Sequence, residues 1–277
     1  TWSSPLEPGE LTELTRLLSN VLGETLRPCW NHLSPPVDLK RWHQPELPER
    51  CIGRELGARY VLRPRGRNHR PRLETVLRPA RRWLSRSANG QSVIDLFARG
   101  GSLGRTAAIH GAAEVWYVDR DPEALRWNKA CNQLDPYRSR PGRWLESECT
   151  PILRQLTGRS MHLRNHRAVA YVEIPRRSFD LVILDPPRRS EGPFGTVDQI
   201  EDPFHYLESA IHCTRPGGRI LLIHRDPGLP RKKWLDQILA VGDTMNLRLD
   251  FEVLHPEADF PDPVHCPALK MAVLERD

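Results

Sequence analysis

The sequence predicts an α/β fold built on a seven-stranded, mostly parallel, doubly wound sheet. From residue 92 onwards, short apolar runs typical of buried strands alternate with helical segments, and such alternation leads to parallel pairing with right-handed crossovers. A glycine-containing turn, ARGGSLG, joins the first of these strands to a helix. Acidic residues lie at or near the ends of three strands, at Asp95, Asp119 and Asp185. Open parallel sheets bind their ligands at this edge.

The elements follow from the pattern along the chain. We expect strands near residues 92–97, 114–119, 143–147, 179–184, 219–224, 247–254 and 269–275, with helices between them. Upstream, residues 10–26 carry leucines at helical spacing, residues 27–49 are rich in proline, and residues 51–64 suit one or two strands. We therefore divide the chain into a small N-terminal α+β appendage, residues 1–72, and a main domain, residues 73–277.

The turn after the first strand is compatible with two roles. Gly100, Gly101 and Gly104 permit positive φ angles and a close approach of the backbone to a ligand, and the next helix offers its first N–H groups. The spacing departs from the strict G-x-G-x-x-G of dinucleotide folds. A ligand site and a plain tight turn therefore explain the glycines equally well.

The acids after the next strands favour a nucleoside ligand. Asp119 follows the glycines at about the fifteen to twenty residues where an acid binds a ribose. Capping of the next helix is the alternative, but Asp121 before Pro122 is better placed for the cap. Asp185 precedes two prolines, which cannot continue a strand ladder, so the chain turns sharply there.

This order of features resembles that of class I methyltransferases, which have a Rossmann-like fold and use S-adenosylmethionine (SAM). More narrowly, residues 72–277 resemble the large-subunit ribosomal RNA methyltransferases that include cytosine-C5 and guanine-N7 enzymes. LRPARRWL at 77–84 and ADFPDPVHCPALKMAVL at 258–274 carry this resemblance, together with DPP at 185–187. It implies that the last strand runs antiparallel to the others. It also implies SAM contacts from Arg78, Asp95, Phe97, Gly101, Gly104, Asp119, Glu148 and Asp185.

Two of these residues have a stated role in the resembled family. Glu148 matches an acid that accepts a hydrogen bond from the adenine amino group, although a helix N-cap is the alternative for a residue in this place. Arg78 matches an arginine that lies over the cofactor. The residue before it, often glutamine or histidine in that family, is Leu77 here.

The predicted catalytic residues are Asp185, Pro186, Pro187 and Arg188. Methyl transfer from a sulfonium is an in-line displacement, so the enzyme mainly aligns the acceptor. The carboxylate of Asp185 and the carbonyls of the turn suit an amino group on a flipped base. Arg188 and Arg189 instead suit a phosphate or a guanine edge. For His224 we expect either a catalytic base or a purely structural position.

The cysteines argue against methylation of a pyrimidine carbon, which requires a thiolate that adds to the ring. The strand at 219–224 ends in His224, Arg225 and Asp226, where the resembled cytosine enzymes have a cysteine. Cys266 remains a remote candidate. We therefore expect methylation of a nitrogen or an oxygen. The six cysteines form no C-x-x-C pair, so we predict no metal site.

Charge points to an acidic partner. The 41 Lys and Arg exceed the 35 Asp and Glu, and ten arginines lie between residues 59 and 86 with one acid between them, Glu74. Such a run is either a solvated face or a phosphate-binding surface. We predict that Arg63, Arg65 and Arg67 contact RNA, with Arg189 and His224 as further substrate contacts. The basic insertion at 157–178 is expected to form a hairpin that faces the substrate.

These observations favour an RNA methyltransferase, most readily one for ribosomal RNA. The alternatives are a methyltransferase for a small molecule or peptide, and an RNA-binding protein that has lost catalysis. No apolar stretch approaches the roughly twenty residues of a membrane span, and the chain does not start with a signal-peptide pattern. We therefore expect a cytoplasmic protein with no membrane partner.

Overall fold

The computed structural model describes residues 13, 16–17, 51–62, 74–133, 142–159, 174–192, 195–199, 202, 204–226, 228–255 and 269–277. By its internal contacts the chain forms two units, residues 1–51 with 63–73, and residues 52–62 with 74–277. In the first unit Glu13, Arg16 and Leu17 are described, all of them helical and exposed. The rest of the predicted helix at 10–26 and the proline-rich segment lie outside the described residues.

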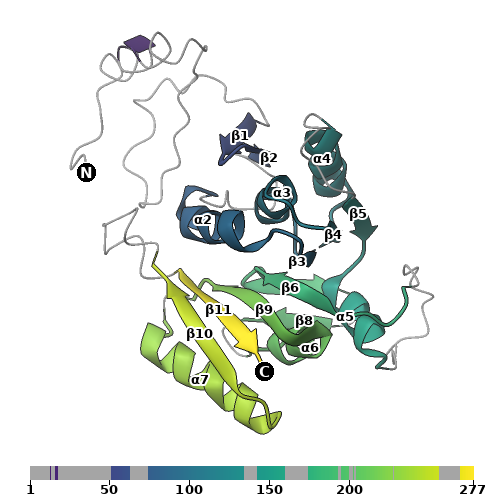
Figure 1. Ribbon diagram of the computed structural model, residues 1–277, viewed down its shortest axis with the longest axis vertical. Coiled ribbons are helices and arrows are strands. Elements are labelled where there is room, and N and C mark those ends of the chain that lie inside the picture. The colour runs from purple at the N-terminus through teal and green to yellow at the C-terminus, as the bar shows by residue number, and fades with distance from the viewer. Residues whose placement is uncertain are drawn as a thin grey trace. The chain divides into compact units, whose positions relative to one another are not determined.

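The second unit is built on a seven-stranded sheet with the order β10-β11-β9-β6-β3-β4-β5 (Figure 1). Strands β3, β4, β5, β6 and β9 are parallel, with a shift of register between β6 and β9 at Phe179–Leu181, and β11 lies antiparallel between β9 and β10. The predicted mostly parallel sheet and its antiparallel last strand are both confirmed. The strand bounds are β3 (Ser92–Leu96), β4 (Glu114–Asp119), β5 (Gly142–Glu146), β6 (Phe179–Leu184), β9 (Thr214–His224), β10 (Leu249–Leu254) and β11 (Lys270–Arg276).

Helices cover both faces of this sheet because alternate strand residues point to opposite sides. One buried cluster joins one set of strand residues, such as Ile94 and Trp116, to α5, α6 and α7. The other joins Val93 and Tyr117 to α2, α3 and α4, as Figure 1 shows. The helix bounds are α2 (Arg78–Ser87), α3 (Ser102–Ile109), α4 (Pro122–Gln133), α5 (Cys149–Thr157), α6 (Leu207–Cys213) and α7 (Arg231–Thr244), and the short 3-10 helix η2 (Glu74–Leu77) precedes α2.

A hairpin of β1 (Cys51–Glu55) and β2 (Ala58–Leu62) packs on α3 and α4 of the second unit. Its Ala58 and Tyr60 are buried, and Glu55 forms ion pairs with Arg78 and with the fully buried Arg81. We expected one or two strands at 51–64, and two are present. Residues 52–62 belong to the same unit as the main sheet. The predicted division at residue 72 instead placed them in the N-terminal appendage.

Candidate active site

The carboxyl ends of β3, β4 and β6 lie together, because β3 pairs in parallel with the other two strands. This edge, which we call the carboxyl edge, holds the three acids that the sequence singled out. Asp95, Asp119 and Asp185 are 2%, 8% and 4% exposed. A buried carboxylate is costly unless hydrogen bonds or cations compensate it, so the partners of each acid indicate its role.

The turn after β3 is strained. Phe97 and Arg99 have φ angles of 61° and 49°, and Gly101 has one of 78°. Positive φ in residues other than glycine costs of order 1–3 kcal/mol and clusters at functional sites. Hydrogen bonds to β4 hold the turn: the Ala98 N–H donates to the Val118 carbonyl at 3.0 Å, and the Arg99 N–H donates to Asp119 Oδ2 at 2.8 Å.

Gly101 and Gly104 are required by packing inside the protein. A Cβ on Gly104 would lie 2.6 Å from Tyr117 Cε1 and 2.7 Å from Asp95 Oδ2, and one on Gly101 would collide with the side chain of Asn128. The Gly104 N–H also donates to Asp95 Oδ2 at 2.9 Å. Asp95 therefore holds the start of α3 against the sheet. Contacts of Asp95 and of the two glycines with SAM stay predictions, since tight packing by itself explains these residues.

Of the two acids after β4, Asp121 is the one that caps α4, as the sequence predicted. Asp121 Oδ1 accepts hydrogen bonds from the Glu123 and Ala124 N–H groups at 3.0 and 3.1 Å, which caps α4. Asp119 accepts one N–H on each oxygen, from Arg99 and from Asp121. Each carboxylate oxygen has a second lone pair. The geometry is therefore compatible with ribose hydroxyls, whose binding stays a prediction.

Glu148 lies two residues beyond the end of β5. It takes the N-cap position of α5, yet its side chain makes no capping hydrogen bond. Its carboxylate instead pairs with Arg120 at 3.3 Å. Arg120 also donates to the Glu191 carbonyl in the hairpin of β7 (Arg189–Gly192) and β8 (Gly195–Asp198). This hairpin directly follows the Asp-Pro-Pro turn, so Arg120 links it to the acid predicted to bind adenine.

A second contact joins the same hairpin to the strained turn. The phenol of Tyr206 is hydrogen-bonded to Thr150 on α5 and to Ser190 on β7, and burial raises its pKa to about 12. Its ring meets Phe97 edge-on, with centroids 5.0 Å apart. The β7–β8 hairpin is thus held against the elements that carry the predicted cofactor residues.

Asp185 is paired with an arginine that the sequence analysis did not select. Arg225 Nε and Nη2 donate to Asp185 Oδ1 and Oδ2, each at 3.1 Å. The pair forms because β6 and β9 are parallel neighbours, so their next residues meet at the carboxyl edge. The sequence held a signal for it, since an arginine follows the strand that adjoins the one ending in Asp-Pro-Pro. Strand order was needed to read that signal.

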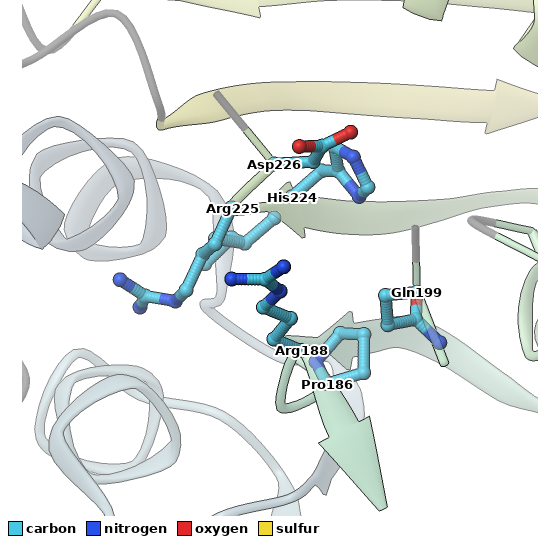
Figure 2. A pocket seen from close by; sticks show the side chains of 7 residues that line it. Pro186, Arg188, Gln199, His224, Arg225 and Asp226 are labelled. Atoms are coloured by element: carbon cyan, nitrogen blue, oxygen red, sulfur yellow. The ribbon is translucent and has the colours of Figure 1, made fainter. Parts of the chain in front are cut away.

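A small pocket opens beside this pair (Figure 2). Pro186, Arg188, Gln199, Ile223, His224, Arg225 and Asp226 line it. It brings together the end of β9, the Asp-Pro-Pro turn and the end of the β7–β8 hairpin. Pro186 and Arg188 come from the predicted catalytic set and His224 from the predicted substrate contacts, whereas the sequence analysis did not select Gln199.

His224 and Gln199, which line this pocket, each have a buried nitrogen without a partner. They are 3% and 5% exposed, and neither Nε2 atom has a hydrogen-bond partner. Burial, with a smaller contribution from the positive charge of Lys270, lowers the pKa of His224 to about 4, while Asp226 acts in the opposite direction. The imidazole stacks on Trp234, with centroids 6.1 Å apart. His224 is therefore neutral near pH 7.

The other predicted residues are more dispersed. The exposed Arg78 is held by Glu55, with Nε and Oε1 2.6 Å apart, so its contact with a cofactor stays a prediction. Arg189 pairs with Glu191 at 2.8 Å on the surface of the hairpin. Arg63, Arg65 and Arg67 lie outside the described residues.

The described cysteines support the expectation that no thiolate takes part. Cys131, Cys149 and Cys213 are buried, and burial raises the pKa of Cys149 and, to about 12, that of Cys213. A thiol that resists ionisation is a weak nucleophile. None of the three lines the pocket beside Asp185. Cys266 lies outside the described residues.

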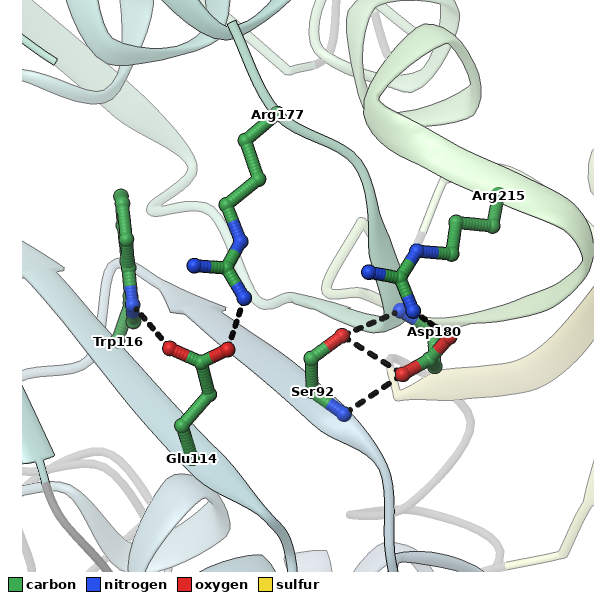
Figure 3. Close-up of polar contacts among 6 residues, drawn as sticks. All are labelled: Ser92, Glu114, Trp116, Arg177, Asp180 and Arg215. Atoms are coloured by element: carbon green, nitrogen blue, oxygen red, sulfur yellow. Dashed lines mark hydrogen bonds and ion pairs between the residues drawn. The ribbon is translucent and has the colours of Figure 1, made fainter. Parts of the chain in front are cut away.

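The opposite, amino edge of the sheet carries a different set of polar contacts (Figure 3). Asp180, near the start of β6, accepts hydrogen bonds from Ser92 and pairs with Arg215 at 2.6 Å. Glu114 binds both Arg177 and the Trp116 indole. Arg177 thus ties the end of the basic insertion to this edge. The described ends of the insertion lie towards the amino edge, because a helix-to-strand connection returns to the amino ends of parallel strands. Residues 160–173, which would form the expected hairpin, lie outside the described residues.

Within the described ranges, no helix is long and apolar enough to cross a membrane. The same residues contain no cluster of three or more His, Cys, Asp or Glu side chains arranged to hold a metal ion. The predicted cytoplasmic location stays a prediction.

Known proteins share parts of this sequence. A family described as "Conserved hypothetical protein 95" matches residues 50–135. A protein named ribosomal RNA large subunit methyltransferase K/L, from Chromohalobacter salexigens, is 29% identical over 211 residues, which are 72% of this chain and 25% of that protein. The chain thus spans about a quarter of the length of the curated relatives it matches.

Solved structures agree on the fold. A methyltransferase crystallised with S-adenosylhomocysteine superposes with a TM-score of 0.66 at 17% identity, covering 84% of this chain and 58% of the other. A SAM-dependent methyltransferase from Agrobacterium tumefaciens gives 0.61 at 16% identity, with 85% and 72% covered. The chain therefore has the Rossmann-like class I methyltransferase fold and resembles the large-subunit ribosomal RNA methyltransferases, as its sequence predicted.

Proposed function

We propose that this protein is a SAM-dependent methyltransferase that acts on RNA, with ribosomal RNA as the leading substrate, at a base nitrogen or an oxygen. One observation carries the proposal. A strained turn held by Asp119 and an Asp-Pro-Pro turn with an adjoining polar pocket lie at the same edge of one class I sheet. The 29% identity to a protein named for ribosomal RNA methylation supports the choice of substrate.

The residues at the carboxyl edge fit SAM. Asp119 would hold the ribose hydroxyls, Glu148 the adenine amino group, and the backbone of residues 97–101 would border the cofactor. The strain at Phe97 and Arg99 supports this assignment, because the fold maintains an unfavourable turn at this place. When bound, SAM supplies an electrophilic methyl group on a sulfonium.

The chain's own contribution to the reaction is alignment of the acceptor. The two prolines of the turn restrict the backbone, and the buried Asp185 and the neutral His224 stay fixed beside the pocket. The residues that line this pocket include no cysteine. His224, which does line it, is neutral near pH 7. Transfer to a nitrogen or oxygen lone pair requires neither a cysteine nor a protonated histidine.

The test of the proposed function has two parts. Calorimetry of the purified protein with SAM should show binding, and mass spectrometry of nucleosides should show one methylated nucleoside missing from the RNA of cells that lack the gene. Turnover of SAM with small molecules and no RNA affinity would favour the small-molecule alternative. RNA affinity without SAM binding would favour an RNA-binding protein that has lost catalysis.

The basic run supplies a separate test of RNA as the partner. Each phosphate neutralised by an arginine releases counterions, so RNA binding should weaken steeply with salt. Changing Arg63, Arg65 and Arg67 together to alanine should lower RNA affinity and reduce the salt slope by about two to three, with SAM affinity unchanged. A triple variant that binds RNA like the parent at every salt concentration would make this run an ordinary solvated surface.

A further inference from the structure

We propose that Asp185 acts on the methyl acceptor through Arg225, which is a positioning and specificity-determining residue of the acceptor pocket. The pocket then meets the acceptor with hydrogen-bond donors, and it favours a substrate edge rich in carbonyl or ring-nitrogen acceptors over an exocyclic amino group. This inference rests on the proposed function and changes the role that the sequence suggested for Asp185.

The first step of the argument is the geometry of the pair. Arg225 approaches Asp185 as a fork, with one N–H on each carboxylate oxygen at 3.1 Å. Bidentate pairs are the strongest and most directional of arginine contacts. Asp185 is 4% exposed, and a carboxylate so buried requires its cation. An amino group on the acceptor would have to compete with this fork.

The second step is the polarity of the pocket. Arg188 and Arg225 are among the residues that line the pocket, and a guanidinium group can only donate. The Gln199 amide nitrogen is also a donor, and it is buried without a partner. His224 Nε2, likewise buried without a partner, donates or accepts according to its tautomer. A buried polar atom left unsatisfied costs about 1–3 kcal/mol, so an acceptor-rich ligand edge would relieve this cost.

The acids around the pocket do not reverse this polarity. Asp226 is the acidic residue among those that line the pocket. Its Oδ1 accepts the Gly228 N–H at 2.8 Å, and its carbonyl accepts a hydrogen bond from Lys270. Lys270 is buried on β11 opposite His224 and adds positive charge on that side. The polar residues that line the pocket thus carry mainly donors and cations.

A double-mutant cycle tests whether Asp185 acts through Arg225. The assay uses an unmodified large-subunit ribosomal RNA transcript and SAM with a labelled methyl group. Asp185→Ala and Arg225→Ala should each lower kcat about 100-fold, as removal of one positioned polar group does. The double variant should be no more than about threefold worse than either, because residues that act as one unit are not additive.

Chemical rescue supplies a readout that a merely structural role would not move. Ethylguanidinium added to Arg225→Ala can occupy the place of the lost side chain beside Asp185. It should raise the kcat of this variant at least tenfold. It should do nothing for the double variant, which lacks the carboxylate. Arg225→Lys keeps the charge but not the fork, and it should recover only part of kcat.

The same two strands offer a matched control. Arg215 and Asp180 form an arginine–carboxylate pair between β9 and β6 at the amino edge. Arg215→Ala should retain the parent's kcat and RNA KM. Thermal unfolding and SAM calorimetry on every variant separate misfolding and cofactor loss from the effect on the acceptor. The double variant leaves neither charge unpaired, so it still reports the effect of losing the pair on kcat where a lone buried charge unfolds a single variant.

The outcomes separate the two proposals. A parent that binds SAM but methylates no RNA overturns the proposed function and this inference with it. A parent that methylates RNA, with an Arg225→Ala variant of equal kcat, overturns the inference alone and returns Asp185 to direct contact with the acceptor. A double variant whose loss of kcat equals the product of the two single losses would likewise overturn the inference alone.

Discussion

The two edges of the central sheet use the same residue types in different ways. At the amino edge, Asp180 and Glu114 are bound by arginines, a serine and an indole, and the contacts of Asp180 tie β6 to its neighbours β3 and β9. At the carboxyl edge, Asp119 and Asp185 are equally well bound, but they lie beside a strained turn and beside buried nitrogens without partners. Ion pairs alone therefore do not mark a site. The strained turn after β3 and the pocket beside the Asp185–Arg225 pair are the additional features that favour the carboxyl edge.

The largest expected effect is on SAM binding at the carboxyl edge. Asp119→Ala should abolish detectable SAM binding in calorimetry, because in the proposed site the carboxylate would bind the ribose hydroxyls, and it also holds the Arg99 N–H. Circular dichroism should show an intact fold. Asp119→Asn retains one acceptor oxygen and should bind SAM weakly. Unchanged affinity in Asp119→Ala would remove the ribose role and leave Asp119 as a support of the turn.

The next effect concerns the pH dependence of stability. The pKa of His224 is about 4 in the folded chain and about 6.5 when unfolded, so the unfolded state binds more protons between these values. Stability from this group is complete above pH 6.5 and is lost as pH falls towards 4, by about 2–3 kcal/mol. Denaturant unfolding at pH 7 and pH 4.5 measures the loss. His224→Asn should have a smaller loss, and an equal one would contradict the assignment.

The smallest effect is expected at the amino edge. Arg177 binds Glu114 and lies over the rings of Trp116 and Phe179, each at 5.1 Å. Arg177→Ala should cost about 1–2 kcal/mol, a shift of a few degrees in Tm, and leave turnover unchanged. A loss of turnover with a normal Tm would bring this edge and the adjoining insertion into the mechanism, and the contrast between the edges would fail.

Some roles could be assigned before the fold was known because they depend on neighbours in the chain. Asp121 caps α4 three residues away, and Pro186 ends β6 through its own ring. Alternation of strands and helices predicts the parallel sheet for the same reason, since each buried run reports its own surroundings. The Asp-Pro-Pro turn and the glycine turn were located in this way.

Only the tertiary structure decided the rest, because it depends on which strands are neighbours. The pairing of β6 with β9 brings Arg225 to Asp185 across 40 positions of sequence. Because α4 and β4 pack on the glycine turn, Asn128 leaves no space for a Cβ on Gly101, and Tyr117 leaves none for a Cβ on Gly104. Local pattern gives each residue its chemistry and its element. Strand order determines which groups share a buried space, and there the low dielectric and the absence of water decide which charges must pair.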